Sequence, residues 1–383
     1  MSKNFLQIHP NDNILAALQD MKKDYVVDFE GKSFPLKNNV TAKHKFALQD
    51  FKVGDPILMY GTLIGKATQP IAQGESITIE NVVHASSDYN VGEQQSHWVA
   101  PDISKWKNST FNGYHRADGS VGTANHWLVI PMVFCENRNV NVLRTTLLNA
   151  LGYETAQDYI IDTEVLVSKY KKGASTEELM ASPIIKTAED IKQNRTFPNV
   201  DGIKFLTHDG GCGCDRGDSD TLCNLLAGYI TNPNVAGATI LSLGCQNAEV
   251  KILEAAIGKR DPNFSKPLYV LEQQKSKSER HFIEEAVKKT FLGLIEANKV
   301  TRQPAPLSKL VLGLECGGSD GFSGISANPA LGYASDLIVA LGGATVLSEF
   351  PELNGVEQEL INRCETPENA EKFASIMRAY SAK

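Results

Sequence analysis

Short apolar runs alternate with longer helical patterns in the second part of the chain, from Phe111 onward. The runs are HWLVIPMVF, GIKFLTH, GATILSLG, PLYVLEQ, KLVLGLE and ATVLSEF. The patterns between and after them predict helices over 137–151, 216–230, 247–258, 277–298, 330–342 and 367–382. Strands that alternate with helices are typical of a parallel sheet with helices on its faces. We therefore expect an α/β fold for this part of the chain.

Residues 1–90 show a different pattern of apolar and polar residues. Short strand-like stretches, among them DYVVDF, KSFPL and ESITIENVV, are separated by Gly, Asp and Pro. This pattern predicts a small all-β module over residues 1–92. The stretch SHWVAPDISKWKN that follows is polar and lacks periodicity, which is typical of a linker and places one over 93–108. Residues 109–383 then form the α/β region, which we expect to contain two subdomains.

The charge of the chain indicates which partners to expect, and its apolar segments indicate the compartment. The formal net charge is −7, and no five-residue stretch is dominated by Lys and Arg, so we expect no nucleic-acid partner. The first residues lack the unbroken apolar core of a signal peptide, and no window has the ~18 apolar residues that a membrane span requires. We expect a cytoplasmic protein that does not enter a membrane. An acidic protein that binds an anion must gather positive charge or a metal locally.

Three of the predicted strands end in turns that contain glycine and cysteine. Cys212 lies in HDGGCG, Cys245 in GCQN and Cys316 in ECGGSD. Because ligands of open α/β sheets bind beyond the carboxyl ends of the strands, we expect these turns to line one crevice. Three thiolates are a donor set for iron, or for an iron–sulfur cluster with one open coordination position. The alternatives are small buried cysteines, or a single ion held by His and carboxylates.

The remaining cysteines have simpler explanations. The total of 7 is odd and the first is Cys135, which does not resemble an extracellular disulfide framework. Cys223 falls within a helical pattern and Cys364 near a helix end, where packing accounts for them. Cys214 is a neighbour of a candidate ligand. We expect these four not to bind metal.

The run from Cys316 to Pro329, CGGSDGFSGISANP, combines glycines, hydroxyls, a carboxylate and an amide. Glycines allow close backbone approach and leave N–H groups free to bind a carboxylate or a phosphate. A purely structural loop is rarely so rich in hydrogen-bonding groups. The residues that we expect to bind substrate here are Ser319, Asp320, Ser323 and Asn328.

A second polar cluster, FNGYHRADGSVGTAN, precedes the first predicted strand of the α/β region. Arg116 is a candidate to clamp a substrate carboxylate in bidentate fashion, and Asn125 is a candidate to bind a hydroxyl. The alternative is a turn in which Arg116 and Asp118 are held by local hydrogen bonds.

Three histidines are candidates for a general base. His44 lies between Lys43 and Lys45, His84 follows the last strand-like stretch of the β module, and His208 lies on a cysteine-bearing turn. A histidine is a common base near neutral pH, although a lone histidine is more often a surface residue. Spacing does not choose among the three, and no pair has helical metal-ligand spacing.

Two familiar catalytic templates are absent. The sequence contains no G-x-x-x-x-G-K-[ST] and no H-E-x-x-H. These motifs bind nucleotide phosphates and protease zinc, respectively. Nucleotide-driven and zinc-protease chemistry are therefore excluded as interpretations.

The longest motifs resemble one family. IHPNDNILAAL, KHKFAL and MYGTLIGKATQPI are similar to the SAF-type β module of altronate and galactarate dehydratases. FNGYHRADGSVGTAN, HDGGCG, GCQN and LECGGSDGFSGISANPALG are similar to their catalytic region. The similarity covers nearly the whole chain. The motifs KHKFAL and TIENVVHASSDY resemble the sequences of the altronate enzymes more than those of the galactarate enzymes.

This resemblance implies a hydro-lyase that dehydrates D-altronate to 2-dehydro-3-deoxy-D-gluconate in hexuronate catabolism. It implies Fe²⁺ or Mn²⁺ as the cofactor, a small sugar acid as the substrate, and 109–383 as the catalytic region. A homo-oligomer is expected of a metabolic enzyme of this kind. The alternatives are a galactarate dehydratase, a sulfolactate lyase, or a sugar-acid-binding protein without catalysis.

Three departures from the family pattern bear on these expectations. Ala124 stands where many members have arginine, and residues 78–80 stand where many have histidines. Family members also usually continue well beyond the position of Lys383, so a further stretch of the catalytic region is expected. The resemblance therefore implies the reaction type more firmly than the substrate.

Overall fold

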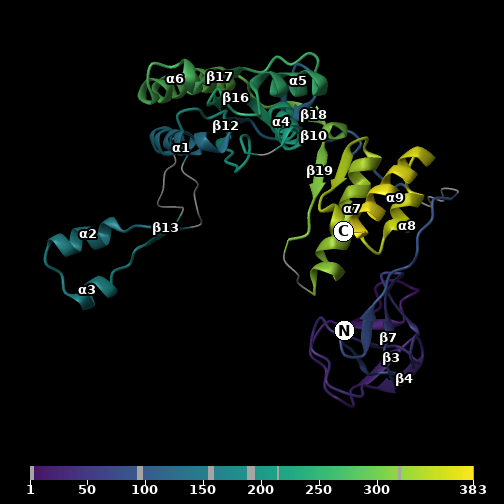
Figure 1. Cartoon of the computed structure of the whole chain (residues 1–383). Helices are drawn as coiled ribbons and strands as arrows, with labels where there is room; N and C mark the ends of the chain where they lie inside the picture. Colours follow the sequence, from purple (N-terminus) through teal and green to yellow (C-terminus); the bar gives the residue numbers. More distant parts are fainter. Residues whose placement is uncertain are drawn as a thin grey trace. The chain divides into compact units, whose positions relative to one another are not determined.

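The computed structural model describes residues 4–92, 98–153, 159–187, 195–213, 215–317 and 321–382. The chain forms two compact units. Unit 1 comprises Met1–Asn108 and Leu310–Lys383, the purple and yellow ends of the colour scale in Figure 1, and unit 2 comprises Ser109–Lys309. One division of the chain thus follows Asn108, where the predicted linker ends.

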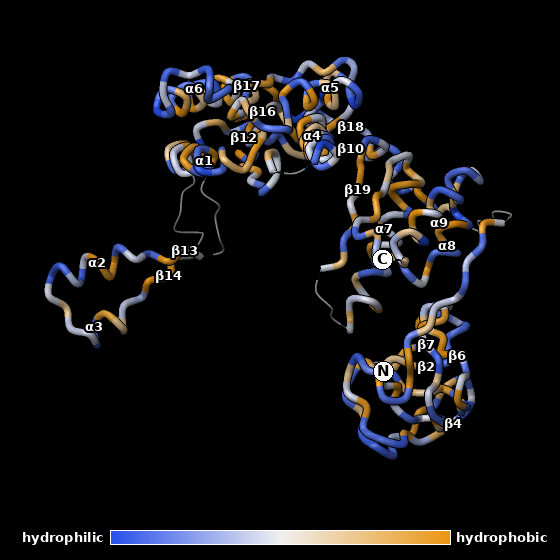
Figure 2. The backbone as a smooth tube through the Cα atoms, in the orientation of Figure 1, coloured by the Kyte–Doolittle hydropathy of each residue, from blue (hydrophilic) through white to orange (hydrophobic). Residues whose placement is uncertain are grey.

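The N-terminal part of unit 1 consists of short antiparallel strands. One sheet has the order β1 (Phe5–Leu6), β2 (Ile14–Ala17), β5 (Lys45–Ala47) and β8 (Ser76–Ile77). A second sheet contains β6 (Pro56–Met59), β7 (Thr62–Ala67) and β9 (Val82–His84), and β3 (Val26–Phe29) pairs with β4 (Lys32–Pro35). Figure 2 shows apolar strand residues of this part in orange and polar turns in blue. The predicted all-β module is confirmed.

Strand β2 shows how so small a module forms a core. Successive side chains of a strand point to opposite faces. In β2 both faces are buried, because Leu15 packs in a cluster with Phe46 and Ile14 packs in a different cluster with Ile57. The four-stranded sheet is therefore covered on both sides.

Unit 2 is built around a parallel sheet with the order β15 (Gly202–Phe205), β12 (His126–Pro131), β16 (Val235–Ser242) and β17 (Leu268–Glu272). Helices α1 (Asn137–Leu151) and α6 (Glu279–Asn298) share one hydrophobic cluster, which includes Trp127 and Val129. Helices α4 (Arg216–Thr231) and α5 (Val250–Arg260) share another, which includes Leu128 and Ile130. Since these residues alternate along β12, helices cover both faces of the sheet. The predicted α/β architecture is confirmed.

Trp127 shows how closely α6 packs on this sheet. Its side chain is fully buried, and its Nε1–H donates to Thr239 Oγ1 at 3.1 Å, which lies 2.8 Å from Thr290 Oγ1 on α6. A Cβ on Gly237 would stand 2.6 Å from the indole ring, and a Cβ on Gly293 would overlap it. Both positions therefore require glycine where the ring passes between strand and helix.

Unit 2 also contains elements that the sequence pattern did not predict. β10 (Thr110–His115), β11 (Val121–Gly122) and β18 (Gln303–Pro306) form a separate sheet. β13 (Tyr159–Ile161) pairs with β14 (Ile185–Thr187), and α2 (Glu164–Lys171) and α3 (Thr176–Met180) lie between them in the sequence. These elements are too short to produce a long periodic pattern.

The C-terminal part of unit 1 has its own parallel pair, β19 (Val311–Leu314) and β20 (Ala344–Leu347), connected through α7 (Ala327–Ala340). Helices α8 (Glu357–Asn362) and α9 (Pro367–Ser381) follow. From the sequence, residues 109–383 are expected to form one α/β region with two subdomains. The structure divides this stretch after Lys309 and groups its last part with the N-terminal module. The division falls there because β18 pairs with β10 inside unit 2, whereas the next strand, β19, pairs with β20 inside unit 1.

The segment after β9 is attached to the C-terminal helices. Asn90 N–H donates to Gln358 Oε1 at 2.8 Å, and Gln358 Nε2–H donates to Asn90 O at 3.1 Å. Tyr89 and Val91 pack against the cluster around Ile361. These contacts join the two sequence-distant parts of unit 1. Among the helices of the described residues, none has the length and apolar character needed to cross a membrane.

Candidate functional site

The turns after β15 and β16 lie at the same edge of the unit 2 sheet. The chain leaves β12 through α1 toward β15 on one side, and leaves β16 through α5 toward β17 on the other side. In open α/β sheets, ligands bind in the crevice between two neighbouring strands whose following connections run to opposite sides of the sheet. In unit 2 this point lies between β12 and β16, beside the turns that carry Cys212 and Cys245.

The turn that carries Cys212 is fixed against its neighbours. Gly211 has a φ of +98°, and a Cβ there would overlap the carbonyl oxygen of Met132, just after β12. Gly211 O accepts a hydrogen bond from Ala248 N–H at 3.1 Å, in the turn that carries Cys245. Cys212 is half-buried and Cys245 is exposed. Two of the predicted cysteines thus lie on turns that are hydrogen-bonded to each other.

A polar cavity of about 450 Å³ adjoins Cys245. Glu249 and Lys251 line it and form an ion pair with an O–N distance of 2.7 Å. Gln246 Nε2–H donates to Ser242 Oγ at 2.7 Å in the same lining. Such a cavity offers hydrogen-bond donors and acceptors together, as a polyhydroxy ligand requires.

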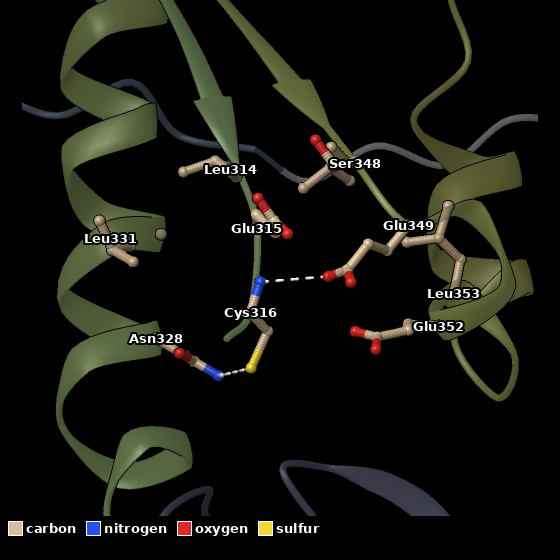
Figure 3. A pocket seen from close by; sticks show the side chains of 11 residues that line it. Leu314, Glu315, Cys316, Asn328, Leu331, Ser348, Glu349, Glu352 and Leu353 are labelled. Atoms are coloured by element: carbon tan, nitrogen blue, oxygen red, sulfur yellow. Dashed lines mark hydrogen bonds between the residues drawn. The ribbon is translucent and has the colours of Figure 1, made fainter. Parts of the chain in front are cut away.

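Unit 1 contains a second cavity, of about 270 Å³, at the carboxyl ends of β19 and β20. Figure 3 shows Glu349 reaching toward Cys316, whose backbone N–H donates to the Glu349 carboxylate at 3.3 Å. Asn328, in the first turn of α7, donates its Nδ2–H to Cys316 Sγ at 3.9 Å. Glu315 and Glu352 also line the cavity. The cavity therefore combines a thiol, an amide and carboxylates.

Glu349 is a functional candidate that sequence reasoning missed. Its backbone lies in the left-handed region, with φ 56° and ψ 55°. This conformation costs a residue other than glycine about 1–2 kcal/mol. Such residues gather at functional sites, where the surrounding structure holds them. The stretch SEFPEL gives no local sign of it, because backbone strain is not visible in sequence.

Three family models match most of the chain. Residues 3–85 match "Altronate/galactarate dehydratase SAF domain", residues 113–298 match "D-galactarate dehydratase/Altronate hydrolase, second domain", and residues 307–383 match "D-galactarate/Altronate dehydratase, C-terminal". The chain belongs to the altronate/galactarate dehydratase family. The β module of unit 1 is thus the SAF domain of the family, and the resemblance seen in the motifs is confirmed.

Individual members of this family align with almost all of the chain. The altronate dehydratase of Bacillus subtilis (strain 168) is 32% identical over 379 residues, which are 99% of this chain and 66% of that protein. The altronate dehydratase of Escherichia coli (strain K12) is 27% identical over 380 residues, 98% of this chain and 66% of that protein. The galactarate dehydratase (L-threo-forming) of the same strain is 27% identical over 385 residues, with shares of 98% and 65%. The chain spans about two thirds of the length of these relatives.

The predicted three-cysteine centre involves both units, because Cys212 and Cys245 lie in unit 2 and Cys316 lies in unit 1. Their convergence stays a prediction. Within the described ranges, no three His, Cys, Asp or Glu side chains are grouped so that they could hold a metal ion. Cys223 is fully buried in α4, and burial raises its thiol pKa to about 11, which fits the packing role expected for it.

The structure gives Arg116 and Asn125 hydrogen-bond partners within unit 2. Asn125 is 0% exposed, and its Nδ2 donates to the carbonyl oxygens of Asn199 at 2.8 Å and Ala297 at 3.0 Å. Its Oδ1 accepts from Arg116 at 3.0 Å. Arg116 also donates from Nε to Pro233 O at 2.7 Å. Both side chains link loops of unit 2, and their predicted roles in substrate binding stay predictions.

Both ring nitrogens of His208 lie within hydrogen-bond distance of backbone groups. Gly210 N–H donates to its Nδ1 at 3.2 Å, and its Nε2 lies 2.7 Å from Pro131 O. The donor at Nδ1 fixes the proton on Nε2, so both ring nitrogens have backbone partners. A base role for His208 would require one of these bonds to break. His44 and His84 are exposed residues of the SAF domain and stay base candidates.

The substrate-binding residues predicted in the 316–329 run have different outcomes. Asn328 lines the unit 1 cavity. Ser323 begins the short helix η5 (Ser323–Ile325) and is half-buried. Ser319 and Asp320 lie outside the described residues, as does Cys214.

The SAF domain contacts this run within unit 1. The ammonium group of Lys43 lies over the ring of Phe322, 5.0 Å from its centroid. Gly324 packs against the hydroxyl of Tyr60. Lys43 is the neighbour of His44, so the structure brings this base candidate to the same part of unit 1 as the polar run.

Glu136 was also missed in the sequence. It ends the short helix η1 (Phe134–Glu136), directly before α1, and is 0% exposed. Asn139 Nδ2–H donates to its Oε2 at 2.8 Å, whereas Oε1 has no hydrogen-bond partner among the described residues. Burial raises the pKa of this carboxyl. A buried acid after the central strand of a sheet is a functional candidate, and local sequence does not reveal its burial.

Proposed function

We propose that this chain acts as a hydro-lyase that dehydrates D-altronate to 2-dehydro-3-deoxy-D-gluconate. The observation that carries the proposal is the similarity to altronate dehydratases from two bacteria over 98–99% of the chain. The polar lining of the cavity beside Cys245 supports a hydroxylated acid as the ligand class. Because the relatives are longer than the matched part, the activity and the substrate are inferences from those relatives.

The reaction requires a base, an electrophile at the carboxylate and assistance for the leaving group. The base takes the C2 proton, the electron pair forms the C2–C3 double bond, and the C3–O bond breaks. The departing hydroxide takes a proton and leaves as water. The enol product then tautomerises to the 2-keto acid, so no oxidant or reductant is consumed.

The chain's own residues supply candidates for these roles. His44 and His84 are exposed imidazoles suited to accept the C2 proton. Asn328 and Glu349 line one cavity and can orient hydroxyl groups through an amide donor and a carboxylate acceptor. Lys251 lines the cavity of unit 2, where its ammonium group pairs with Glu249.

The proposal includes Fe²⁺ or Mn²⁺, or an iron–sulfur cluster, as the family resemblance implies. When bound, such a group supplies a Lewis acid to the carboxylate and the C3 hydroxyl. Cys212 and Cys245 offer thiolates at one sheet edge, but the described residues do not group three ligands at one point. The base candidates and the orienting groups named above are side chains of the chain itself.

A substrate panel tests the proposal. Protein purified without oxygen and supplied with Fe²⁺ is incubated with D-altronate, galactarate and sulfolactate, and the release of 2-keto acid and of sulfite is measured. We expect 2-keto acid from D-altronate. Turnover of galactarate or sulfolactate alone would assign the chain to a rival activity. Calorimetric binding of D-altronate without product would indicate a sugar-acid-binding protein.

A further inference from the structure

We propose that the segment from β13 to β14, residues 159–187, is the surface through which two copies of this chain pair about a two-fold axis. In this pairing, α2 of one copy lies antiparallel to α2 of the other copy. The sequence leads us to expect a homo-oligomer, but it does not indicate which surface forms one. This surface is separate from the dehydration proposed above and does not depend on it.

The β13–β14 segment has no core of its own. None of the side chains that the structure describes between 161 and 185 is buried. A two-stranded pair is marginally stable in water, and so are isolated helices shorter than about 12–15 residues. β13 and β14 form only a two-stranded sheet, while α2 has 8 residues and α3 has 5. These elements therefore require a packing surface from outside the segment.

The segment nevertheless has defined turns and helix ends. Ser175 caps α3, because its Oγ accepts from Glu178 N–H at 3.3 Å and its own N–H donates to Glu178 Oε2 at 2.8 Å. This reciprocal arrangement is a capping box, which fixes the start of a helix. After α2, Gly173 has a φ of +79° and its N–H donates to Tyr170 O at 2.9 Å. The segment therefore presents its side chains from regular structure, as a binding surface requires.

Large apolar side chains are exposed on this segment. Ile161 and Ile185 lie directly opposite each other across the β13–β14 pair and are 56% and 64% exposed. Opposite residues of two paired strands share one face and contact each other. Tyr170 on α2 is 74% exposed and Met180 on α3 is 83% exposed. Figure 2 shows apolar residues of the segment in orange beside polar residues in blue. A gathered set of exposed apolar residues marks an interaction surface.

The charges of α2 favour a second copy of the chain as the partner. Glu164 lies in the first turn of α2 and Lys171 in its last turn. Val167 is 49% exposed, and it follows Glu164 by three residues and precedes Lys171 by four, so the three share one face of the helix. Along the helix axis, Glu164 is about 4.5 Å from Val167 and Lys171 is about 6 Å from it on the other side. A two-fold axis beside Val167 therefore places Glu164 of each copy against Lys171 of the other copy.

Other arrangements satisfy these charges less well. In a two-fold interface the same patch faces itself, so each attractive contact occurs twice. A parallel pair of α2 helices would place Glu164 beside its own copy and Lys171 beside its own copy, and like charges placed together oppose association. A uniformly acidic or basic partner would meet a like charge at one end of α2. The antiparallel pair avoids both conflicts and covers Val167.

Charge reversal in the full chain tests this pairing. Glu164→Lys and Lys171→Glu are prepared separately, and self-association is measured by sedimentation velocity over a series of concentrations. Both side chains are exposed, so neither change disturbs a core. Each variant alone brings like charges together twice in the pair. In an equimolar mixture the reversed charge of one variant meets the reversed charge of the other, so opposite charges face each other again.

We expect the wild-type chain to dimerise and each single reversal to raise the dimer dissociation constant roughly tenfold or more, while the mixture regains the wild-type value. Val167→Ser should also weaken the dimer. Its matched control is Val53→Ser, which changes a 64% exposed valine of the SAF domain and should have no effect. A wild-type chain that stays monomeric would overturn the inference, as would a dimer that neither reversal weakens. A mixture as weak as the single variants would refute the antiparallel pairing.

Discussion

Replacing Gly211 by alanine tests how the Cys212 turn is fixed to the sheet. The position has a φ of +98°, which costs a residue other than glycine about 1–2 kcal/mol. The new Cβ would overlap Met132 O and stand 2.8 Å from Val133 Cα, and crowding against fixed backbone typically costs a further ~1–3 kcal/mol. We therefore expect Gly211→Ala to lower the free energy of unfolding of unit 2 by about 2–5 kcal/mol.

Gly213 supplies the matched control on the other side of Cys212. A Cβ there meets no described atom within 4 Å, and its φ is not in the left-handed range. Gly213→Ala should change the free energy of unfolding by no more than about 0.5 kcal/mol, as surface substitutions usually do. Comparing Gly211→Ala with Gly213→Ala thus separates the effect of strain and crowding at the backbone from the effect of replacing a glycine as such.

The assay is urea unfolding followed by tryptophan fluorescence. Trp127 is fully buried in unit 2, whereas Trp98 and Trp106 belong to unit 1. Changing Trp98 and Trp106 to phenylalanine makes the signal specific for unit 2. A Gly211→Ala midpoint equal to that of Gly213→Ala, with an unchanged m-value, would refute the proposed fixation of the turn.

Three further predictions concern other parts of the chain. Because burial raises the pKa of Glu136 in the folded protein, the folded state holds its proton more tightly. The free energy of unfolding should therefore fall as pH rises from the ordinary glutamate pKa through the raised value, and Glu136→Gln should remove this slope in denaturation at a series of pH values. Asn125→Ala removes three hydrogen bonds of a buried side chain and should lower the free energy of unfolding by roughly 2–4 kcal/mol, whereas an effect on KM alone would contradict its structural role. A chelator should abolish 2-keto acid formation, Fe²⁺ should restore it, and the circular dichroism spectrum should not change.

Local patterns in the sequence predicted the main helices around the parallel sheet of unit 2 well. Helix α1 has the predicted bounds, 137–151, and α6 begins and ends within two residues of the predicted 277–298. Both have apolar residues at helical spacing, and α6 starts with Ser278 as an N-cap that accepts from His281 N–H. Such signals need no knowledge of distant residues.

The roles of single polar residues could not be predicted in the same way. Arg116 and Asn125 have the chemistry of substrate-binding residues, but their partners Pro233, Asn199 and Ala297 are brought to them by the fold. The position of Cys135 between two other cysteine turns follows from strand order, which a list of predicted strands does not contain. Long-range pairing therefore decides which polar residues are structural.

The reaction itself is the most direct test of the account. The iron-loaded chain is mixed with D-altronate without oxygen, and proton NMR spectra are recorded over time. We predict that the altronate signals decline while the C3 methylene signals of 2-dehydro-3-deoxy-D-gluconate grow in proportion. A folded, iron-containing chain that leaves D-altronate unchanged would contradict the proposed activity.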